Sequence, residues 1–306
     1  MDIWQLLIAC LYGVVEGITE WLPISSTGHM LLLDEVVSLD VSEEFWNMFL
    51  VVIQLGAILA VCVLYFRQLN PFSRTKDAGE RRATWGLWGK IVLACVPAAL
   101  VGIPLDDVME RYLYRAPVVA AALVAYGVAF IAIERWRARS LERRVAEEVP
   151  RGAHFARPAA PAPTPGGDFG AICRVEDMPL RVAVGIGLFQ VLSLIPGTSR
   201  SGSTIIGGLL LGCTRGVAAE FTFFLAIPVM FGASALKLAK YLLLDGGAFG
   251  ATEAWVMVAG CLTAFLVSLA AIRWLTGFVR RHTFVAFGVY RIVLGLAVIA
   301  WFALAA

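Results

Sequence analysis

Continuous apolar runs, each about as long as a membrane span, alternate along this chain with short polar segments. A helix that crosses a bilayer needs about 20 predominantly apolar residues. Six stretches meet that requirement, namely 45–66, 87–105, 116–134, 217–241, 254–275 and 283–304. They lack the alternation of apolar and polar positions that marks the strands of a transmembrane β-barrel. The pattern therefore predicts an all-α polytopic membrane protein with six spanning helices.

Two further apolar stretches are interrupted by small polar residues. Residues 3–37 contain Pro-Ile-Ser-Ser-Thr-Gly-His at 23–29, and residues 180–212 contain Pro-Gly-Thr-Ser-Arg-Ser-Gly at 196–202. Irregular backbone at membrane depth is tolerated only where protein buries it or where it lines a wet cavity. We therefore predict two re-entrant helix–loop–helix hairpins, each of which enters and leaves the membrane on one side.

The charged loops alternate in sign along the chain. Basic residues gather in 67–90, 135–181 and 273–282, whereas acidic residues gather in 34–44, 106–110 and 245–253. With six spans and two re-entrant hairpins, every basic loop falls on one side, which the positive-inside rule makes the cytoplasm. Both termini are then predicted to face outward.

Composition agrees with a membrane protein and excludes several other classes. Of the 306 residues, 59% are hydrophobic and 16% are charged, and the mean hydropathy is +0.79. Soluble domains are about 45–50% apolar and about 25% charged. The composition therefore excludes an ordinary soluble enzyme, a disordered chain and a disulfide-stapled module, and the net charge of +2 gives no reason to expect nucleic acid.

The chain is predicted to form a single membrane domain over 1–306, built from two repeats. The first repeat covers 1–134 and the second covers 180–306, with a cytoplasmic linker at 135–179. Within that linker, 150–170 is rich in Pro, Ala and Gly, so we expect it to be disordered.

The two repeats share a sequence pattern. Leu22 to Gly28 parallels Ile195 to Ser201, and Phe49 to Ala57 parallels Phe221 to Val229. Three predicted spans separate the hairpins, and an odd number inverts the second half relative to the first. Inverted repeats with broken helices place a ligand site near the midplane, where the positive ends of half-helices suit an anion.

Two acids lie in the first hairpin. Glu16 and Glu20 are four residues apart, so their carboxylates share one helix face with Gly13 and Gly17. Small residues four apart let another helix come close, which predicts that this face points into the bundle. Intramembrane acids favour a functional role; the alternative is a pair of wetted residues near a helix end.

His29 and three hydroxyl residues follow the acids. His29 titrates near neutral pH, so beside two acids it is a candidate proton carrier, although a lone histidine is more often a structural residue. Ser25, Ser26 and Thr27 precede a predicted short helix, where at least one is expected to serve only as an N-cap.

Arg200 is the most informative cation of the second hairpin. Its planar guanidinium matches phosphate with two parallel hydrogen bonds and keeps its charge. Thr198, Ser199 and Ser201 add hydroxyl donors, and Gly197 lets backbone N–H groups approach a ligand.

Two arginines also have a structural interpretation. Arg200 would neutralise buried charge by pairing with Glu16 or Glu20, a partner that a substrate can replace. Arg291, inside the last span, is interpreted as a structural partner or as a residue that snorkels to the interface.

The two carboxylates would repel a phosphate group unless a hard divalent cation lies between the carboxylates and the phosphate. Mg²⁺ and Ca²⁺ prefer oxygen ligands and bridge phosphates, so Glu16 and Glu20 are candidate metal ligands. Phosphoryl transfer relies on positioning and on charge neutralisation, both of which this set of residues can supply.

The two motifs resemble the signature segments of the undecaprenyl-pyrophosphate phosphatase family, also called bacitracin-resistance proteins. Residues 16–29 (EGITEWLPISSTGH) and 196–202 (PGTSRSG) are ungapped and in the family's order, and 51–56 (VVIQLG) is also similar. The resemblance covers nearly the whole chain. The segment 136–178 looks expanded relative to typical members, which bears on regulation or partners rather than on chemistry.

The resemblance implies an integral enzyme of the bacterial inner membrane that removes the terminal phosphate from undecaprenyl pyrophosphate, recycles the carrier lipid for peptidoglycan synthesis and confers bacitracin resistance. It also implies an active site open to the periplasm, dependence on a divalent cation and a homodimer. Carried over by position, the family's functional residues are Glu16, Glu20, Ser26, His29, Thr198, Ser199, Arg200 and Ser201.

From the residues and the resemblance together, we predict a membrane lipid pyrophosphatase. The predicted catalytic residues are Glu16, Glu20, Ser26, His29 and Arg200, with Glu16 and Glu20 also binding Mg²⁺ or Ca²⁺. The predicted phosphate-binding residues are Ser25, Thr27, Gly197, Thr198, Ser199, Arg200 and Ser201. The alternative is an inverted-repeat transporter of a lipid phosphate or another anion, for which Arg200 would serve equally well.

Overall fold

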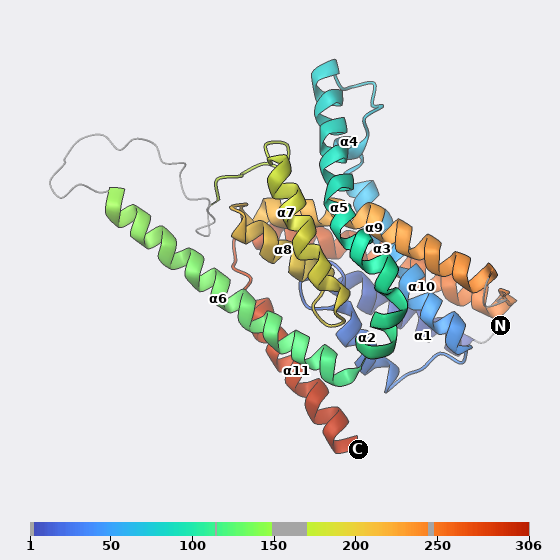
Figure 1. Ribbon diagram of the computed structural model, residues 1–306. Helices are drawn as coiled ribbons and strands as arrows, with labels where there is room; N and C mark the ends of the chain where they lie inside the picture. The colour runs from blue at the N-terminus through green and yellow to red at the C-terminus, as the bar shows by residue number, and fades with distance from the viewer. Residues whose placement is uncertain (1–2, 114, 149–169, 244–247, 306) are drawn as a thin grey trace.

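The computed structural model describes residues 3–113, 115–148, 170–243 and 248–305 (Figure 1). Every regular element in those ranges is a helix, apart from one isolated bridge between Ile172 and Cys213. The helices are α1 Ile3–Thr19, α2 Ser26–Asp34, α3 Glu43–Leu64, α4 Phe66–Leu69, α5 Ala78–Leu113, α6 Ala116–Glu148, α7 Leu180–Val191, the 3₁₀ turn η1 Leu192–Leu194, α8 Arg200–Leu210, α9 Arg215–Leu243, α10 Ala251–Val279 and α11 Val285–Ala305.

Six of the described helices are long and apolar enough to cross a membrane. Their candidate spans are Glu43–Leu64, Ala78–Leu105, Ala116–Arg143, Arg215–Leu243, Ala251–Val279 and Val285–Leu304. Each contains most or all of one stretch predicted from the hydrophobic pattern, so the prediction of six spans is confirmed. Large apolar side chains such as Val92, Leu100 and Ile103 of α5 are exposed, which suits contact with lipid tails rather than with water.

The two interrupted stretches form pairs of short helices, as the sequence indicates. The first pair is α1 and α2, and the second is α7 with η1, followed by α8. Each break follows from local chemistry, because Pro23 and Pro196 have no N–H for a helix bond. Just before α2 and α8, Ser25 and Ser199 adopt left-handed backbone conformations, with φ of 74° and 69°.

Helix packing follows the same pattern in both halves. Helix α1 packs against α10, and its counterpart α7 packs against α5, the counterpart of α10. Helix α3 contacts α9, and α6 contacts α11, so corresponding helices of the two halves also meet each other. In Figure 1, α6 and α11 lie side by side over part of their length.

The serines with left-handed backbone before the two short helices are offset by one residue from the sequence alignment of the two halves. The left-handed residue before the short helix is Ser25 in the first half and Ser199 in the second. Ser25 lies two residues after Pro23, whereas Ser199 lies three residues after Pro196. The second loop therefore has one more residue between its proline and the short helix than the first loop has.

The glycine face of α1 packs closely on α10, as predicted. A Cβ atom on Gly13 would lie 2.6 Å from the carbonyl oxygen of Gly260, and one on Gly17 would lie 2.8 Å from that of Ala264. Because this face is turned into the bundle, Glu16 is carried inward with it and is 1% exposed.

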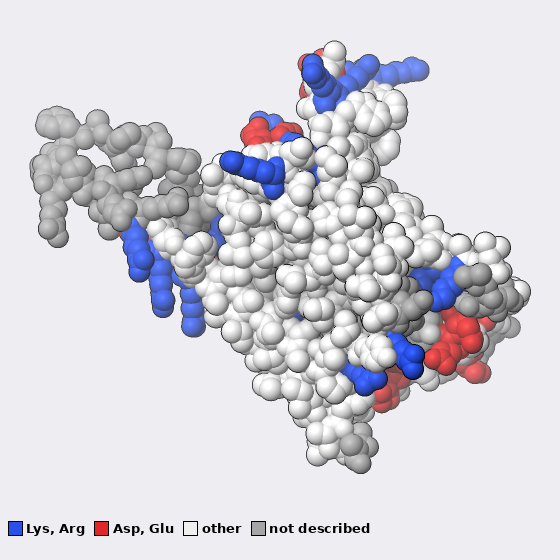
Figure 2. All heavy atoms as spheres, viewed as in Figure 1, with Lys and Arg blue, Asp and Glu red and all other residues white. Residues whose placement is uncertain are grey.

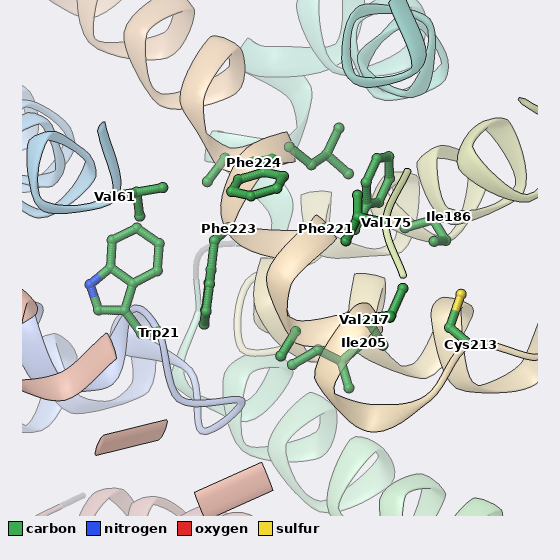
Figure 3. Close-up of a cluster of buried hydrophobic side chains, with 14 of the residues drawn as sticks. Trp21, Val61, Val175, Ile186, Ile205, Cys213, Val217, Phe221, Phe223 and Phe224 are labelled. Carbon is green, nitrogen blue, oxygen red and sulfur yellow. The ribbon is translucent and has the colours of Figure 1, made fainter. Parts of the chain in front are cut away.

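The main hydrophobic core connects the first loop to the second half of the chain (Figure 3). Trp21, which follows α1, is fully buried and meets the Phe223 ring of α9 edge-on, with ring centroids 5.5 Å apart. Figure 3 shows Val61 beside Trp21 and Ile205 near Val217. This packing fixes the chain on both sides of the polar loops.

Helix α6 is longer than predicted. The predicted span ends at residue 134, but the helix continues to Glu148 and so includes the first part of the predicted linker at 135–179. The last part is also ordered, since Val175 and Met178 are buried in the core. The predicted disordered stretch at 150–170 lies outside the described residues except for Gly170, which is described.

Charged side chains avoid the middle of the visible face (Figure 2). Lys and Arg gather at the upper end and along the far end of α6, with some acids among them, while the largest patch of Asp and Glu lies at the lower right beside a few basic residues. The nearly uncharged belt between them fits a protein embedded in a bilayer.

Candidate active site

Three predicted site residues form a continuous hydrogen-bonded chain between the two loops. The Ser26 hydroxyl donates to Glu20 Oε2 at 2.8 Å, and Arg200 Nη2 donates to Glu20 Oε1 at 3.0 Å. The side chains of Arg200 and Glu20 are only 11% and 9% exposed. Both oxygens of Glu20 are therefore occupied, one by a hydroxyl and one by a cation.

The Arg200 guanidinium is held through two of its nitrogens and keeps the third without a partner in the described part of the chain. Its Nη1 donates to the carbonyl oxygen of Thr222 on α9 at 3.0 Å. Its Nε is buried and has no hydrogen-bond partner among the described residues. Because Nε and Nη2 form the edge that binds oxyanions bidentately, this edge can accept a phosphate group once Nη2 shares or releases Glu20.

Ser201 connects the two loops through the backbone. Its hydroxyl lies 3.1 Å from the carbonyl oxygen of Glu20 and 3.3 Å from that of Leu22, and it is 1% exposed. The predicted phosphate ligand Ser201 thus binds protein in this structure.

A cleft of about 420 Å³ lies at the Ser26 end of this chain, and neither Glu20 nor Arg200 is among its lining residues. Glu16, Ser26 and Thr27 line it, together with residues of α2, α3 and α9, namely Met30, Leu31, Asp34, Glu43, Trp46, Asn47, Leu50, Val51, Gln54 and Lys237. Its volume is in the range of ligand pockets. Acidic side chains reach it from α1, α2 and the first turn of α3.

Glu16 fits a ligand of a hard cation. Its Oε1 is buried and has no hydrogen-bond partner among the described residues, although its side chain reaches the cleft. No group of three or more His, Cys, Asp or Glu in the described ranges could hold a metal ion. Mg²⁺ needs no such cage, because it commonly binds through one or two carboxylates, with water and substrate phosphates completing its shell.

His29 forms no hydrogen bond with Glu16 or Glu20 and has a different set of partners. Its Nδ1 lies 2.7 Å from the carbonyl oxygen of Ser25, so this nitrogen carries the hydrogen. Its Nε2 lies 2.7 Å from the hydroxyl of Tyr290 on α11, and the two rings stack with an interplanar angle of 5°. In the neutral ring, Nε2 therefore accepts a hydrogen bond from Tyr290.

The remaining predicted phosphate ligands are engaged mainly with their own hairpin. The Thr198 hydroxyl donates to the carbonyl oxygens of Leu192 and Ile195, and the Ser199 hydroxyl accepts the N–H of Gly202. Gly197 has a φ of +92°, which favours glycine. These contacts shape the loop from which Arg200 extends.

The N-cap expected in the first loop is not formed by a side chain. Ser25 occupies the cap position of α2, but its side chain makes no capping bond, and its Oγ is buried without a partner among the described residues. Ser26 contacts Glu20 instead, and Thr27 lines the cleft. At the start of α8, by contrast, the Ser199 side chain forms the capping bond by accepting the N–H of Gly202.

Two residues of α11 contact the site and were not predicted to do so. Tyr290 binds His29, and nothing in its local sequence indicates this. Arg291 is fully buried and donates to carbonyl oxygens of both loops, which confirms the interpretation as a structural partner; the interpretation as a snorkelling residue was wrong. An arginine inside an apolar span was the signal that it has a buried partner.

The fold and the site together define a multi-pass helical membrane protein with buried acids, hydroxyls and two arginines where two broken helices meet. Comparison with known families makes this specific: the chain belongs to the family described as bacitracin resistance protein BacA, which matches residues 9–297.

Similar proteins cover almost the whole chain. One from Streptococcus thermophilus is 50% identical over 295 residues, which is 96% of this chain and 92% of that protein. One from Acetivibrio thermocellus is 46% identical, and the match covers 97% of this chain and 98% of that protein. One from Enterococcus faecalis is 44% identical, and the match covers 98% of this chain and 97% of that protein. Each of these relatives is named undecaprenyl-diphosphatase.

Proposed function

We propose that this protein hydrolyses undecaprenyl pyrophosphate to undecaprenyl phosphate and inorganic phosphate, which recycles the carrier lipid for cell-wall synthesis. The names of the full-length relatives support this activity, and the family description supports a link to bacitracin resistance. The single structural observation that carries the proposal is the Ser26–Glu20–Arg200 chain, which joins a hydroxyl, a base and a phosphate-binding cation.

Ser26 is the proposed nucleophile. Its Oγ attacks the terminal phosphorus while Glu20 Oε2 accepts its proton, and the bond from that phosphorus to the bridging oxygen breaks, which releases undecaprenyl phosphate. Water then attacks the phosphoserine and releases inorganic phosphate. In the alternative route, Glu20 takes a proton from a water that attacks the phosphorus directly, and Ser26 only binds phosphate.

Arg200 neutralises the pyrophosphate in this scheme. Its free Nε and its Nη2 form one edge, while Nη1 stays on the carbonyl oxygen of Thr222. Preorganised donors of this kind stabilise charge as it develops in the transition state. When Nη2 shifts to the substrate, Glu20 loses part of its counter-charge and becomes a stronger base for the Ser26 proton.

Glu16 is the proposed ligand of a divalent cation, Mg²⁺ or Ca²⁺. When bound, such a cation neutralises pyrophosphate oxygens and favours departure of the phosphate monoester. Glu16 is better placed than Glu20 for this role, because Glu16 Oε1 has no partner among the described residues and both Glu20 oxygens have one.

His29 remains a proposed proton carrier. Its hydrogen bond to the Ser25 carbonyl oxygen ties it to the residue before the nucleophile. Its Nε2, which faces Tyr290, is the nitrogen that can gain a proton.

We also propose an inverted repeat in which α1–α2 and α7–α8 are re-entrant hairpins, with the site opening toward the periplasm of a bacterial inner membrane. The matching helix order and packing of the halves support the repeat. Asp34 and Glu43, which line the cleft, belong to an acidic loop, and the positive-inside rule assigns acidic loops to the outer side. A homodimer, expected from the family resemblance, is also part of the proposal.

The rival function is transport of a lipid phosphate or another anion without hydrolysis. The test is release of inorganic phosphate from undecaprenyl pyrophosphate by the purified protein in detergent, with and without EDTA. A hydrolase releases phosphate and loses activity in EDTA, with Ser26→Ala as the inactive control. Absence of release by folded wild-type protein with added Mg²⁺ or Ca²⁺ would favour the transporter.

A further inference from the structure

One buried arginine, Arg291 of α11, joins the two broken helices. Its Nη1 donates to the carbonyl oxygen of Pro23 at 3.2 Å. Its Nη2 donates to the carbonyl oxygens of Gly197 at 2.7 Å and Thr198 at 3.0 Å. One guanidinium therefore holds backbone from both loops at once.

The charge of Arg291 has no carboxylate partner in the described part of the chain. Its guanidinium carbon lies 5.4 Å from the centre of the Tyr126 ring, and the side chain is 0% exposed. A buried charge is costly unless polar groups surround it. Here carbonyl oxygens and an aromatic face take that role, so the charge is stabilised only while the loops keep their present positions.

The three carbonyl groups lie close in sequence to the reacting residues. Pro23 is three residues before Ser26, and Thr198 is two residues before Arg200. The bonds from Arg291 therefore fix the separation between the proposed nucleophile and the cation that binds its phosphate. Ser201 also joins these loops, because its hydroxyl bonds to the carbonyl oxygens of Glu20 and Leu22.

We propose that Arg291 is a positioning residue, which clamps the two loops so that Ser26, Glu20 and Arg200 meet in a reactive arrangement. This role rests on the proposed hydrolytic function. Because Arg291 is fully buried, it does not touch substrate, and its effect passes through the loops. A misplacement of about 1 Å by a change away from the reacting atoms can slow a reaction by about 10².

The test compares two variants, Arg291→Gln and Arg291→Lys, with a matched control, Arg137→Gln. Arg137 is also buried and also donates to two carbonyl oxygens, those of Leu209 and Cys213, but these lie at the far end of α8. Arg291→Lys keeps the charge and most of the volume, so it is the variant expected to fold, while one ammonium group cannot reproduce the planar fork.

Two readouts are measured on purified full-length protein. We expect kcat for phosphate release to fall by about 10² in both Arg291 variants with KM changed less than about threefold, because lost positioning affects the transition state more than tail binding. We also expect faster amide hydrogen exchange at 22–29 and at 195–203 in these variants. In Arg137→Gln we expect a lowered melting temperature, near-normal kcat and unchanged exchange in both loops.

Each outcome has a defined meaning. If Arg291→Lys folds and keeps kcat and loop exchange near those of Arg137→Gln, the clamp is overturned and Arg291 is only a stabilising residue. If wild-type protein releases no phosphate, the proposed function fails, and the exchange comparison still decides whether Arg291 holds the loops. If Arg291→Gln does not fold, Arg291→Lys alone decides.

Discussion

Replacing Arg200 with lysine separates phosphate recognition from simple charge pairing. In the structure, Arg200 pairs with Glu20 through Nη2 and with the Thr222 carbonyl oxygen through Nη1, and its Nε is free of partners among the described residues. Lysine keeps the positive charge, so it can still neutralise Glu20. It cannot offer two parallel donors to a phosphate while a third donor stays on Thr222.

The expected loss follows from the number of donors removed. Losing one well-placed donor to a developing negative charge costs about 10²–10³ in turnover, or about 2.7–4 kcal/mol. We therefore expect kcat of Arg200→Lys to fall by about 10²–10³, with a smaller change in KM. Arg200→Ala should be worse, because it also leaves Glu20 buried without a counter-charge.

The assay is steady-state phosphate release by purified variants, with thermal unfolding measured on the same samples. Arg215→Lys is the matched control, because Arg215 forms the other described buried arginine–glutamate pair, with Glu134, at 2.8 and 2.7 Å. We expect this control to lower the melting temperature and to leave kcat near that of wild type. Near-normal kcat in Arg200→Lys would refute bidentate recognition and return Arg200 to a structural ion pair.

Four further predictions test the two acids, the orientation in the membrane and the segment between α6 and α7. Glu20→Gln should lower turnover at least ~100-fold, the scale of lost general-base catalysis. Glu16→Gln should raise the concentration of Mg²⁺ or Ca²⁺ needed for half-maximal rate, and an unchanged metal titration would count against Glu16 as ligand. Cys173, which is exposed, should react with a membrane-impermeant maleimide only after cells are permeabilised; labelling in sealed cells would reverse the orientation. Deletion of 152–168 should leave hydrolysis nearly unchanged, since closure entropy varies only logarithmically with loop length, and a loss beyond about tenfold with normal expression would give the segment a role in the mechanism.

The spanning helices were predictable because one effect, the transfer of apolar side chains into lipid, dominates their formation. A run such as 45–66 carries no charged residue, and transfer of its side chains into lipid outweighs local preferences, so its place in α3 follows from composition alone. The inward face of α1 was predictable for a related reason, since Gly13 and Gly17 let α10 approach where larger side chains would prevent it.

The end of α6 was not predictable from hydropathy. Beyond Glu134 the sequence is rich in Arg, Glu and Ala, which ends an apolar span but still favours a helix in water. A prediction based only on the length of the apolar run therefore ends the helix too early. Residues 135–148 were assigned to the linker for this reason.

Contacts between distant segments were the least predictable part of the site. Tyr290 meets His29 across 261 residues of sequence, and Arg291 reaches loops 93 to 268 residues away. Ser25 and Ser199 have left-handed backbone just before the two short helices, and serine gives no sequence signal for that conformation. Residue type identified the acids, Ser26 and Arg200 as a set, but only tertiary packing shows which atoms meet.

The most direct test of the account is the fate of the terminal phosphate during a single turnover. Undecaprenyl pyrophosphate labelled in that phosphate is mixed with excess protein, quenched in acid, and the protein is digested and mapped. We predict transient label on the peptide containing Ser26, none in Ser26→Ala, and strongly slowed labelling in Glu20→Gln, whose amide cannot accept the hydroxyl proton. Release of labelled phosphate at the normal rate by Ser26→Ala, with no labelled protein in wild type, would contradict Ser26 as the nucleophile.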